Sequence, residues 1–226
     1  MIVVLGIVVL LAVVFGPSLW ARSVLARYGD ERSYFPGNAG ELARHLLDEA
    51  GLQEVAVEAT DAGDHYDPLG KAVRLKRENL EGRSLTAVVT AAHEVGHALQ
   101  DRDGYGPLRT RTELIRATAT ITKVGSGIIF GTMVLSAIAR SPGLVLLGLA
   151  AGITTLAINV VIHLVTLPVE FDASFNRALP ILDQDGYLPK QDLPAARRIL
   201  EACALTYVAA ALVNLLNLWR WIRVFR

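Results

Sequence analysis

The sequence predicts an α-helical membrane protein with a small α+β region between its first and second hydrophobic helices. Hydrophobic residues make up 52% of the 226-residue chain and charged residues only 19%, which is more apolar than an ordinary soluble domain. The apolar residues are clustered into long stretches rather than dispersed. Most polar residues fall in the segment 21–116, which is too short to build a large core alone. We therefore expect this segment to pack against the membrane helices.

Residues 1–20 are predicted to form the first transmembrane helix. The aliphatic run from Ile2 to Phe15, extended as far as Trp20, is about as long as the hydrocarbon core of a bilayer requires. A signal peptide is the alternative, but no basic region precedes the run and no clear small-x-small cleavage site follows it. The sequence therefore favours a retained anchor.

Segment 21–116 alternates between helical and strand patterns. Asn38 is a predicted helix N-cap and Gly51 a helix end, and the strand-like runs alternate apolar with polar residues. In chain order, the segment is predicted to contain a helix over 39–50, a strand over 53–59, a turn-rich loop over 61–70, a strand over 71–77 and a helix capped by Ser84. The strand over 71–77 is predicted to be an edge strand.

The last predicted helix of this segment carries the most informative motif of the chain, His93-Glu94-Val95-Gly96-His97. Residues four apart share one face of a helix, with Cβ atoms about 5–6 Å apart, so both imidazoles can reach one tetrahedral Zn²⁺. Glu94 then projects beside the metal, where it can accept a proton from the bound water. An ordinary amphipathic helix with two incidental histidines is the alternative. Gly96 argues against it, because a mid-helix glycine costs roughly 1 kcal/mol relative to alanine and indicates close packing.

Two further apolar stretches are predicted to form a transmembrane hairpin over 117–167. The first ends near Ala139, and Ser141-Pro142-Gly143 makes a tight turn into the second. Residues 168–198 follow as a helix and loop. The last segment, 199–226, is apolar at first but carries asparagines and arginines, so it either crosses the bilayer or lies along its surface.

A catalytic zinc site usually has three protein ligands and a water, so a third ligand must come from elsewhere in the chain. No third histidine follows the motif at the short metzincin spacing. Glu170 lies just beyond the predicted hairpin, on the same membrane side as the two histidines, and is the better candidate. The alternative is that Glu170 is not a ligand but lies at the start of a helix, where the helix dipole stabilises a carboxylate.

Charge and cysteine content bear on partner and compartment. The formal net charge is zero, which gives no reason to expect nucleic-acid binding. Basic residues follow the first apolar stretch, precede the second and follow the third, and the positive-inside rule then predicts a cytoplasmic motif. The basic C-terminus disagrees with this orientation if 199–226 crosses the bilayer. The single cysteine, Cys203, excludes an intrachain disulfide and is compatible with a cytoplasmic site.

Three segments carry a family resemblance: Ala91 to Gln100, which contains the motif, His65-Tyr66-Asp67-Pro68, and Leu167 to Ser174. Together they resemble the YugP-type neutral zinc membrane metallopeptidases over most of the chain, and more loosely the HtpX-like membrane proteases. The resemblance implies a zincin-like catalytic region of the gluzincin type and one Zn²⁺ per chain. It also implies that the metal ligands are His93, His97 and Glu170, and that Glu94 is the general base. Ser174 stands where the HtpX-like pattern has Asp.

Other polar residues are weaker candidates for the site. His65 and Tyr66, in the loop before the second strand, could hydrogen-bond the oxyanion that develops opposite the base. Tyr187 could play the same role, and Ser174 could contact the ligands. The alternative for each is a loop or surface residue without a catalytic part.

These observations predict a zinc-dependent endopeptidase integral to a bacterial-type plasma membrane. Its edge strand would hold extended polypeptide by backbone hydrogen bonds, although a strand that only covers the helix is equally compatible. Location alone points to membrane proteins as substrates, with the lipid bilayer as the other partner and no nucleic acid. The alternative is a non-catalytic membrane scaffold that keeps zinc as a structural clip.

Overall fold

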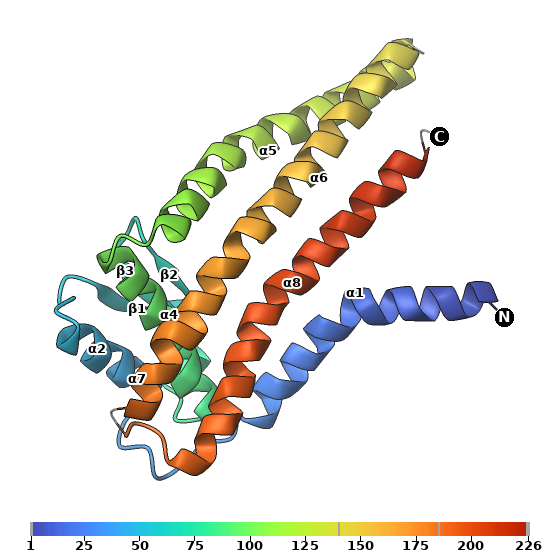
Figure 1. Cartoon of the computed structure of the whole chain (residues 1–226). Coiled ribbons are helices and arrows are strands. Elements are labelled where there is room, and N and C mark those ends of the chain that lie inside the picture. The colour runs from blue at the N-terminus through green and yellow to red at the C-terminus, as the bar shows by residue number, and fades with distance from the viewer. Residues whose placement is uncertain (1, 140, 185, 225–226) are drawn as a thin grey trace.

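A computed structural model describes residues 2–139, 141–184 and 186–224 of the chain. The described residues form a mostly helical protein with one three-stranded sheet. The polar region lies at one end, and four long helices extend from it (Figure 1). The prediction of a helical fold with a small α+β region is confirmed in this coarse form.

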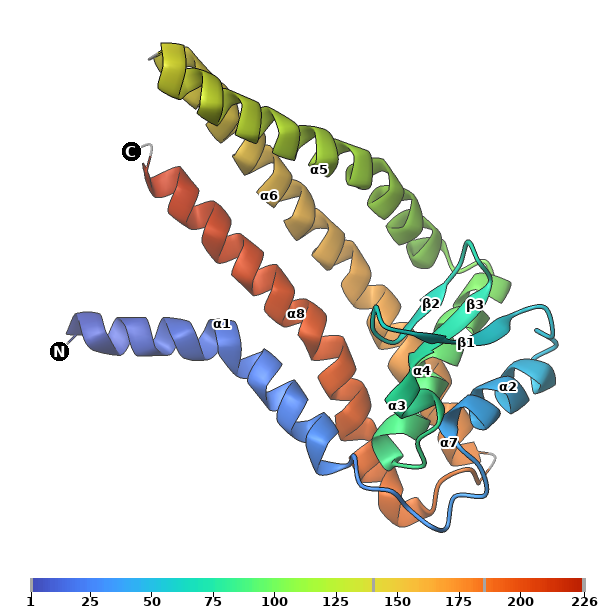
Figure 2. The same ribbon diagram turned by 180° about the vertical axis from the view of Figure 1, so that it is seen from behind.

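The long helices are α1 (Ile2–Arg27), α5 (Gly106–Ala139), α6 (Pro142–Phe171) and α8 (Leu193–Val224). Helices α5 and α6 pack along each other as an antiparallel hairpin, and α8 runs beside α6 (Figure 1, Figure 2). Helix α1 contacts α8 near the polar region, and its N-terminal part diverges from the other helices (Figure 2). Helix α8 covers most of the predicted segment 199–226, of which residues 225 and 226 lie outside the described residues.

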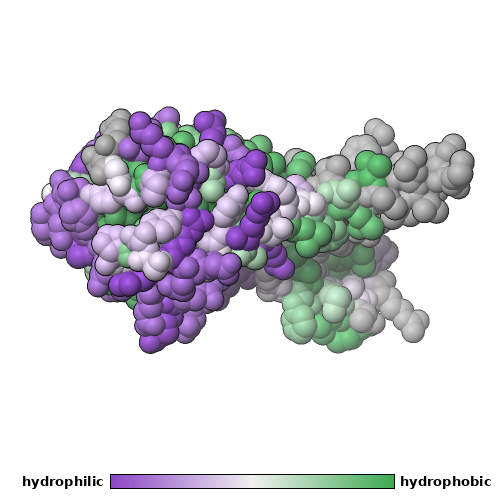
Figure 3. Space-filling model, turned by 90° about the horizontal axis from the view of Figure 1, so that it is seen from below, coloured by the Kyte–Doolittle hydropathy of each residue, from purple (hydrophilic) through white to green (hydrophobic). Residues whose placement is uncertain are grey.

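Two stretches of the described residues are long and apolar enough to cross a membrane, Gly106–Ser136 and Pro142–Asp183. Large apolar side chains are exposed along the hairpin, among them Phe130 at 67% and Ile138 at 76%. Figure 3 shows a hydrophilic surface over the polar region and a hydrophobic surface on the visible helices beyond it. Contiguous apolar surface of this kind is unusual in monomeric soluble proteins.

The polar region contains α2 (Ala39–Glu49), β1 (Ala56–Thr60), β2 (His65–Asp67), β3 (Ala72–Lys76), α3 (Arg77–Leu80) and α4 (Leu85–Arg102). The side chain of Asn38 accepts a hydrogen bond from the backbone N–H of Glu41, and the Glu41 side chain accepts one from the backbone of Asn38. Ser84 caps α4 by accepting a hydrogen bond from the backbone of Ala87. Both predicted N-caps are confirmed.

The sheet has the strand order β1-β3-β2, with β1 parallel and β2 antiparallel to β3. The prediction that the strand over 71–77 is an edge was wrong, because β3 is the central strand. Strand β2 is an edge, and it lies within the segment predicted as a loop over 61–70. The three residues between Asp64 and Pro68 are too few for an alternating pattern to be recognised. Figure 2 shows the sheet beside α4.

Helix α4 is the centre of the polar region, and each of its residues from Leu85 to Gln100 is buried. It contacts α2, the sheet, the start of α8 and η1, a π-helix over Asp172–Ala178 that follows α6. The hydrophobic core joins α4 to α1, α2, α8 and α7 (Leu179–Gln184). The polar region therefore packs against the base of the long helices, as its size predicts, and mainly against α1, α8 and the extension of α6.

Helix α6 continues beyond residue 167, where the predicted hairpin ends, and through Pro168. It passes directly into η1 and then α7, and the 3₁₀ helix η2 (Lys190–Asp192) precedes α8. Glu170 therefore lies in the last turn of a 30-residue helix. The alternative that Glu170 marks a helix start is wrong for that reason.

Candidate metal centre

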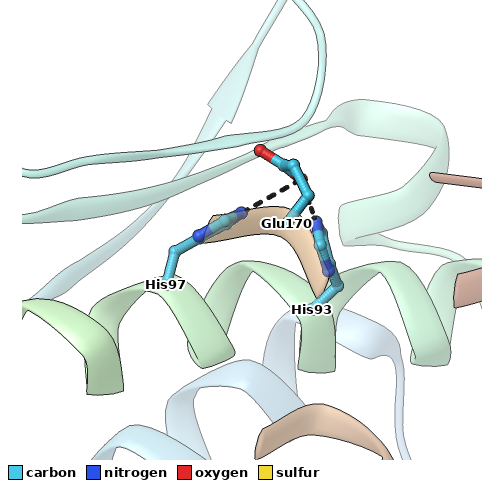
Figure 4. Close-up of side chains that lie close together, drawn as sticks. All are labelled: His93, His97 and Glu170. Atoms are coloured by element: carbon cyan, nitrogen blue, oxygen red, sulfur yellow. Dashed lines mark hydrogen bonds and ion pairs between the residues drawn. The ribbon is translucent and has the colours of Figure 1, made fainter. Parts of the chain in front are cut away.

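Two histidines of α4 point to the same side of the helix, as their spacing predicts (Figure 4). The rings of His93 and His97 lie edge to face, with centroids 4.7 Å apart. Both side chains are buried, with exposed fractions of only 4% and 5%. Buried imidazoles need polar partners within the protein.

Glu170 reaches this pair from α6, although it lies 77 residues after His93 in the chain (Figure 4). Its Oε2 is 3.2 Å from Nε2 of His93 and 3.5 Å from Nε2 of His97. The glutamate is completely buried. One potential ligand atom of each residue lies within 4.8 Å of the other two. The structure thus brings together the three residues predicted as metal ligands, which we call the ligand triad.

A hydrogen-bond chain fixes which nitrogen of His97 faces Glu170. The amide Nε2 of Gln100 donates to the carbonyl of Val169 and to Oδ2 of Asp172, both at 2.8 Å. Because both of these partners are acceptors, the amide oxygen of Gln100 must be the atom that faces Nδ1 of His97, at 2.9 Å. Nδ1 of His97 therefore carries a proton, so in the neutral imidazole the lone pair is on Nε2, which faces Glu170.

Ser174 makes the corresponding contact with His93. Its Oγ lies 3.1 Å from Nδ1 of His93, and the serine is completely buried. When Nδ1 donates to this oxygen, the lone pair of His93 is on Nε2, which faces Glu170. Ser174 therefore contacts a histidine of the triad through a hydroxyl group.

Gly96 lies between the two histidines because η1 packs directly against α4 at this point. A Cβ atom on Gly96 would lie 2.7 Å from the carbonyl oxygen of Ala173, closer than real Cβ atoms approach. The close packing that Gly96 predicts is confirmed. This contact holds η1, which carries Ser174, against the helix of the two histidines.

Glu94 lies beside the triad and lines a cavity of about 570 Å³. We call it the larger cavity, because a second, smaller one lies beside His97. Its walls come from the end of α1, from α3, α4 and α8, and from the loop before β2. Burial raises the pKa of the Glu94 carboxyl to about 7. A carboxyl group with a pKa near neutrality can both accept and return a proton.

A smaller cavity of about 310 Å³ adjoins His97. It is lined by β2 and the residues just after it, and by the first turns of α5, including Arg111 and Arg116. The two cavities share no lining residue. Gly63 and Asp64, just before β2, line the larger cavity, and the residues of β2 itself line the smaller one, so the chain passes from one cavity to the other at the start of β2.

The structure separates the residues that were predicted to contact the oxyanion. His65 and Tyr66 line the smaller cavity, but the Tyr66 hydroxyl donates to Asp101 at 2.7 Å. Tyr187 does not lie at the triad. Its hydroxyl donates to Glu49 at 3.0 Å, and its ring lines a different cavity. We therefore remove Tyr187 from the candidate site.

Sequence reasoning missed two residues of the site. Gln100 orients His97, and Arg111 of α5 has its Nη1 3.4 Å from Oε1 of Glu170. Gln100 follows His97 by three residues, a spacing that puts both on one helix face and that could have indicated the contact. In the sequence, Arg111 was only one of the basic residues near a predicted membrane boundary. Such residues indicate the orientation of the protein in the membrane and not a role at the metal site.

The donor set of the triad fits a zinc ion. Two imidazole nitrogens and one carboxylate oxygen form catalytic zinc sites in which a fourth position stays open to water or substrate. Both histidines engage Nδ1 elsewhere and leave Nε2 for a metal. No hydrogen-bond partner within the described part of the chain reaches Oε1 of Glu170, and the guanidinium of Arg111 lies 3.4 Å from this oxygen.

Replacing Gln100 by leucine is expected to weaken zinc binding about 10–100-fold, the usual cost of losing a hydrogen bond that orients a ligand histidine. Without the Gln100 oxygen, Nδ1 of His97 has lost its acceptor and the ring is free to turn. Competition with a chromogenic zinc chelator measures the affinity of the purified chain. Gln53→Leu is the matched control, because Gln53 is an exposed glutamine. Wild-type affinity in Gln100→Leu would mean that His97 does not need this support.

The chain is similar to proteins described as putative zinc metallopeptidases and membrane proteases. A family model described as "Putative neutral zinc metallopeptidase" matches residues 2–226. A Bacillus subtilis (strain 168) protein described as "Putative membrane protease YugP" is 38% identical over 216 residues, which cover 93% of this chain and 92% of that protein. No solved structure matches the chain significantly.

Proposed function

The chain belongs to this family of zinc metallopeptidases, and on that basis we propose that it is a membrane-integral endopeptidase that hydrolyses peptide bonds with zinc-activated water. The observation that carries the proposal is the ligand triad with Glu94 beside it at an open cavity. His93, His97 and Glu170 would hold one Zn²⁺ per chain. Zinc bound there would lower the pKa of a bound water and polarise the substrate carbonyl.

Glu94 is the proposed general base. It follows His93 directly on α4 and lines the larger cavity, so its carboxylate can meet a water molecule on the His93 side of the triad. It accepts a proton from the attacking water and passes it to the nitrogen of the leaving amine. The pKa near 7 that burial gives this carboxyl suits a group that exchanges its proton at neutral pH.

Strand β2 is the proposed docking edge for an extended substrate. One side of β2 pairs with β3, and the other side has no strand partner among the residues that the structure describes. A polypeptide that adds to this edge gains backbone hydrogen bonds whatever its sequence. Strand β2 lines the smaller cavity together with His97, and the two residues before it line the larger cavity together with His93, so such a peptide would pass the triad.

A location in the plasma membrane is supported by the hairpin of α5 and α6. Its two apolar stretches expose large hydrophobic side chains that a bilayer would cover. The Bacillus subtilis relative is described as a membrane protease. The basic residues that flank the apolar stretches favour a cytoplasmic site. We infer a multi-pass protein whose substrates are polypeptides, with membrane proteins among them.

Removing the metal is expected to abolish hydrolysis reversibly, because the attacking water would lose its activator. The test uses the detergent-purified chain, fluorescein-labelled casein as an unfolded probe, and 1,10-phenanthroline as the chelator. Cleavage should fall to background and return when zinc is added. The isomer 1,7-phenanthroline, which does not chelate, is the control. Cleavage that continues after mass spectrometry finds no zinc in the protein would contradict the proposal.

A further inference from the structure

We propose that Arg111 stabilises the negative charge that develops on the carbonyl oxygen of the peptide bond during hydrolysis. This inference rests on the proposed function and adds a catalytic residue to it. The cation comes from α5, the helix that leads into the hairpin, and not from the helix of the two histidines.

An ion pair holds Arg111 next to the triad. Its Nη1 lies 3.4 Å from Oε1 of Glu170, and its side chain is only 21% exposed. The other carboxylate oxygen, Oε2, faces the two histidines. Glu170 therefore faces the metal site with one oxygen and the arginine with the other. The pair fixes a positive charge next to the triad before any substrate binds, and preorganised charge of this kind stabilises the transition state without reorganisation at the moment of reaction.

Arg111 and the proposed base lie on different sides of the triad. Glu94 and His93 line the larger cavity, whereas Arg111 and His97 line the smaller one. The base must reach both the attacking water and the leaving nitrogen, and the carbonyl oxygen points away from both as the carbon becomes tetrahedral. A peptide docked along β2 and the two residues before it would extend from the smaller cavity to the larger one, so its reacting oxygen can face Arg111 while Glu94 acts from the other side.

Arg111 suits this role better than Tyr66 and His65, which line the same smaller cavity. The hydroxyl of Tyr66 already donates to Asp101. Nδ1 of His65 lies 2.7 Å from the carbonyl oxygen of Gly63, so at most its Nε2 can face the cavity. A guanidinium keeps its charge at every physiological pH and presents five N–H donors. Its hydrogen bonds to an anion are about twice as strong as those of a neutral donor.

The alternative is that Arg111 only holds Glu170 in position. Loss of the arginine would then loosen the carboxylate, and zinc binding would weaken with it. Loss of an oxyanion contact would instead leave zinc and substrate binding intact and slow only the chemical step. The two roles therefore give different results in the same variant.

The kinetic test uses the full-length, zinc-loaded chain in detergent and a quenched fluorescent peptide taken from a cleavage site in casein. Arg111→Gln is expected to lower kcat about 10²–10³-fold, the usual cost of losing one oxyanion donor, with KM and zinc content unchanged. Arg111→Lys keeps the charge and should retain part of the rate. Arg109→Gln is the matched control, because Arg109 is an exposed arginine at the start of the same helix, and it should behave as wild type.

A second measurement does not depend on turnover. N-phosphoryl-leucyl-phenylalanine carries a tetrahedral anionic phosphoryl group, which resembles the tetrahedral intermediate of peptide hydrolysis. Calorimetry measures its binding to the zinc-loaded Glu94→Gln chain, with and without Arg111→Gln. The added substitution should weaken binding by the same factor by which it lowers kcat/KM in the active enzyme.

Three results would overturn the role of Arg111. The first is a wild-type kcat in Arg111→Gln, and the second is a zinc content that falls together with hydrolysis. The third is unchanged binding of the phosphoryl dipeptide. A wild-type chain that cleaves neither casein nor the peptide would overturn the proposed function itself, so the two failures are distinguishable.

Discussion

The Glu170→Ala variant is expected to purify without zinc and to have no hydrolytic activity. Catalytic zinc sites use three protein ligands, and the substitution would leave two imidazoles. Within the described residues, the only group of potential ligands that meets at this point is His93, His97 and Glu170. The loss of zinc affinity should therefore exceed the roughly 10–100-fold that removal of an outer hydrogen bond costs. Zinc per chain, measured by mass spectrometry after dialysis, checks this result.

Glu113→Ala is the matched control, because Glu113 is an exposed glutamate on α5. It should bind zinc and hydrolyse casein as the wild type does. Thermal unfolding separates a lost ligand from a lost fold: zinc should raise the Tm of the wild type and of Glu113→Ala, because it binds only their folded state, and should leave Glu170→Ala unchanged. Stoichiometric zinc with wild-type affinity in Glu170→Ala would refute the ligand set and the hydrolase proposal with it.

The Glu94→Gln variant is expected to keep its zinc and to lose hydrolysis by about 10²–10⁴-fold, the range attributed to a positioned general base. Glutamine has nearly the same shape as glutamate, so the cavity wall and α4 remain intact. It has no carboxylate that could accept a proton from water. The zinc content and the rate of casein cleavage are measured on the same preparation.

Glu78→Gln is the control for this substitution, because Glu78 lines the same cavity but is exposed on α3. It should leave the cleavage rate unchanged. Glu94→Gln chains that cleave at the wild-type rate would mean that Glu94 is not the base. If the wild type itself has no measurable activity on unfolded membrane proteins, the zinc is better explained as a clip that joins α4 to α6 in a non-catalytic scaffold.

The local chemistry of α4 could be predicted from the sequence, because it depends on residues that are close in the chain. The spacing of His93 and His97 fixes a shared helix face, Ser84 supplies the cap, and Gly96 indicates close packing that the carbonyl of Ala173 provides. A local sequence pattern was not enough to predict Glu170 as a ligand, because it lies 77 residues after His93. The need for a third ligand and the family resemblance pointed to it together.

Contacts between elements could not be predicted in this way. Gln100 matters because its amide meets Val169 and Asp172, and Arg111 matters because α5 meets the end of α6. The edge strand was assigned wrongly for a related reason: an alternating pattern identifies a strand but not its neighbours in the sheet. The membrane orientation remains a prediction from the basic residues.

The hairpin of α5 and α6 separates the two histidines from Glu170 in the chain. During synthesis, the ribosome therefore adds His93 and His97 to the chain well before it adds Glu170. The three side chains can meet only after α5 and α6 have formed the hairpin. A nascent chain that ends before Glu170 therefore carries only two of the three proposed metal ligands, so the proposed site is complete only after the hairpin has formed.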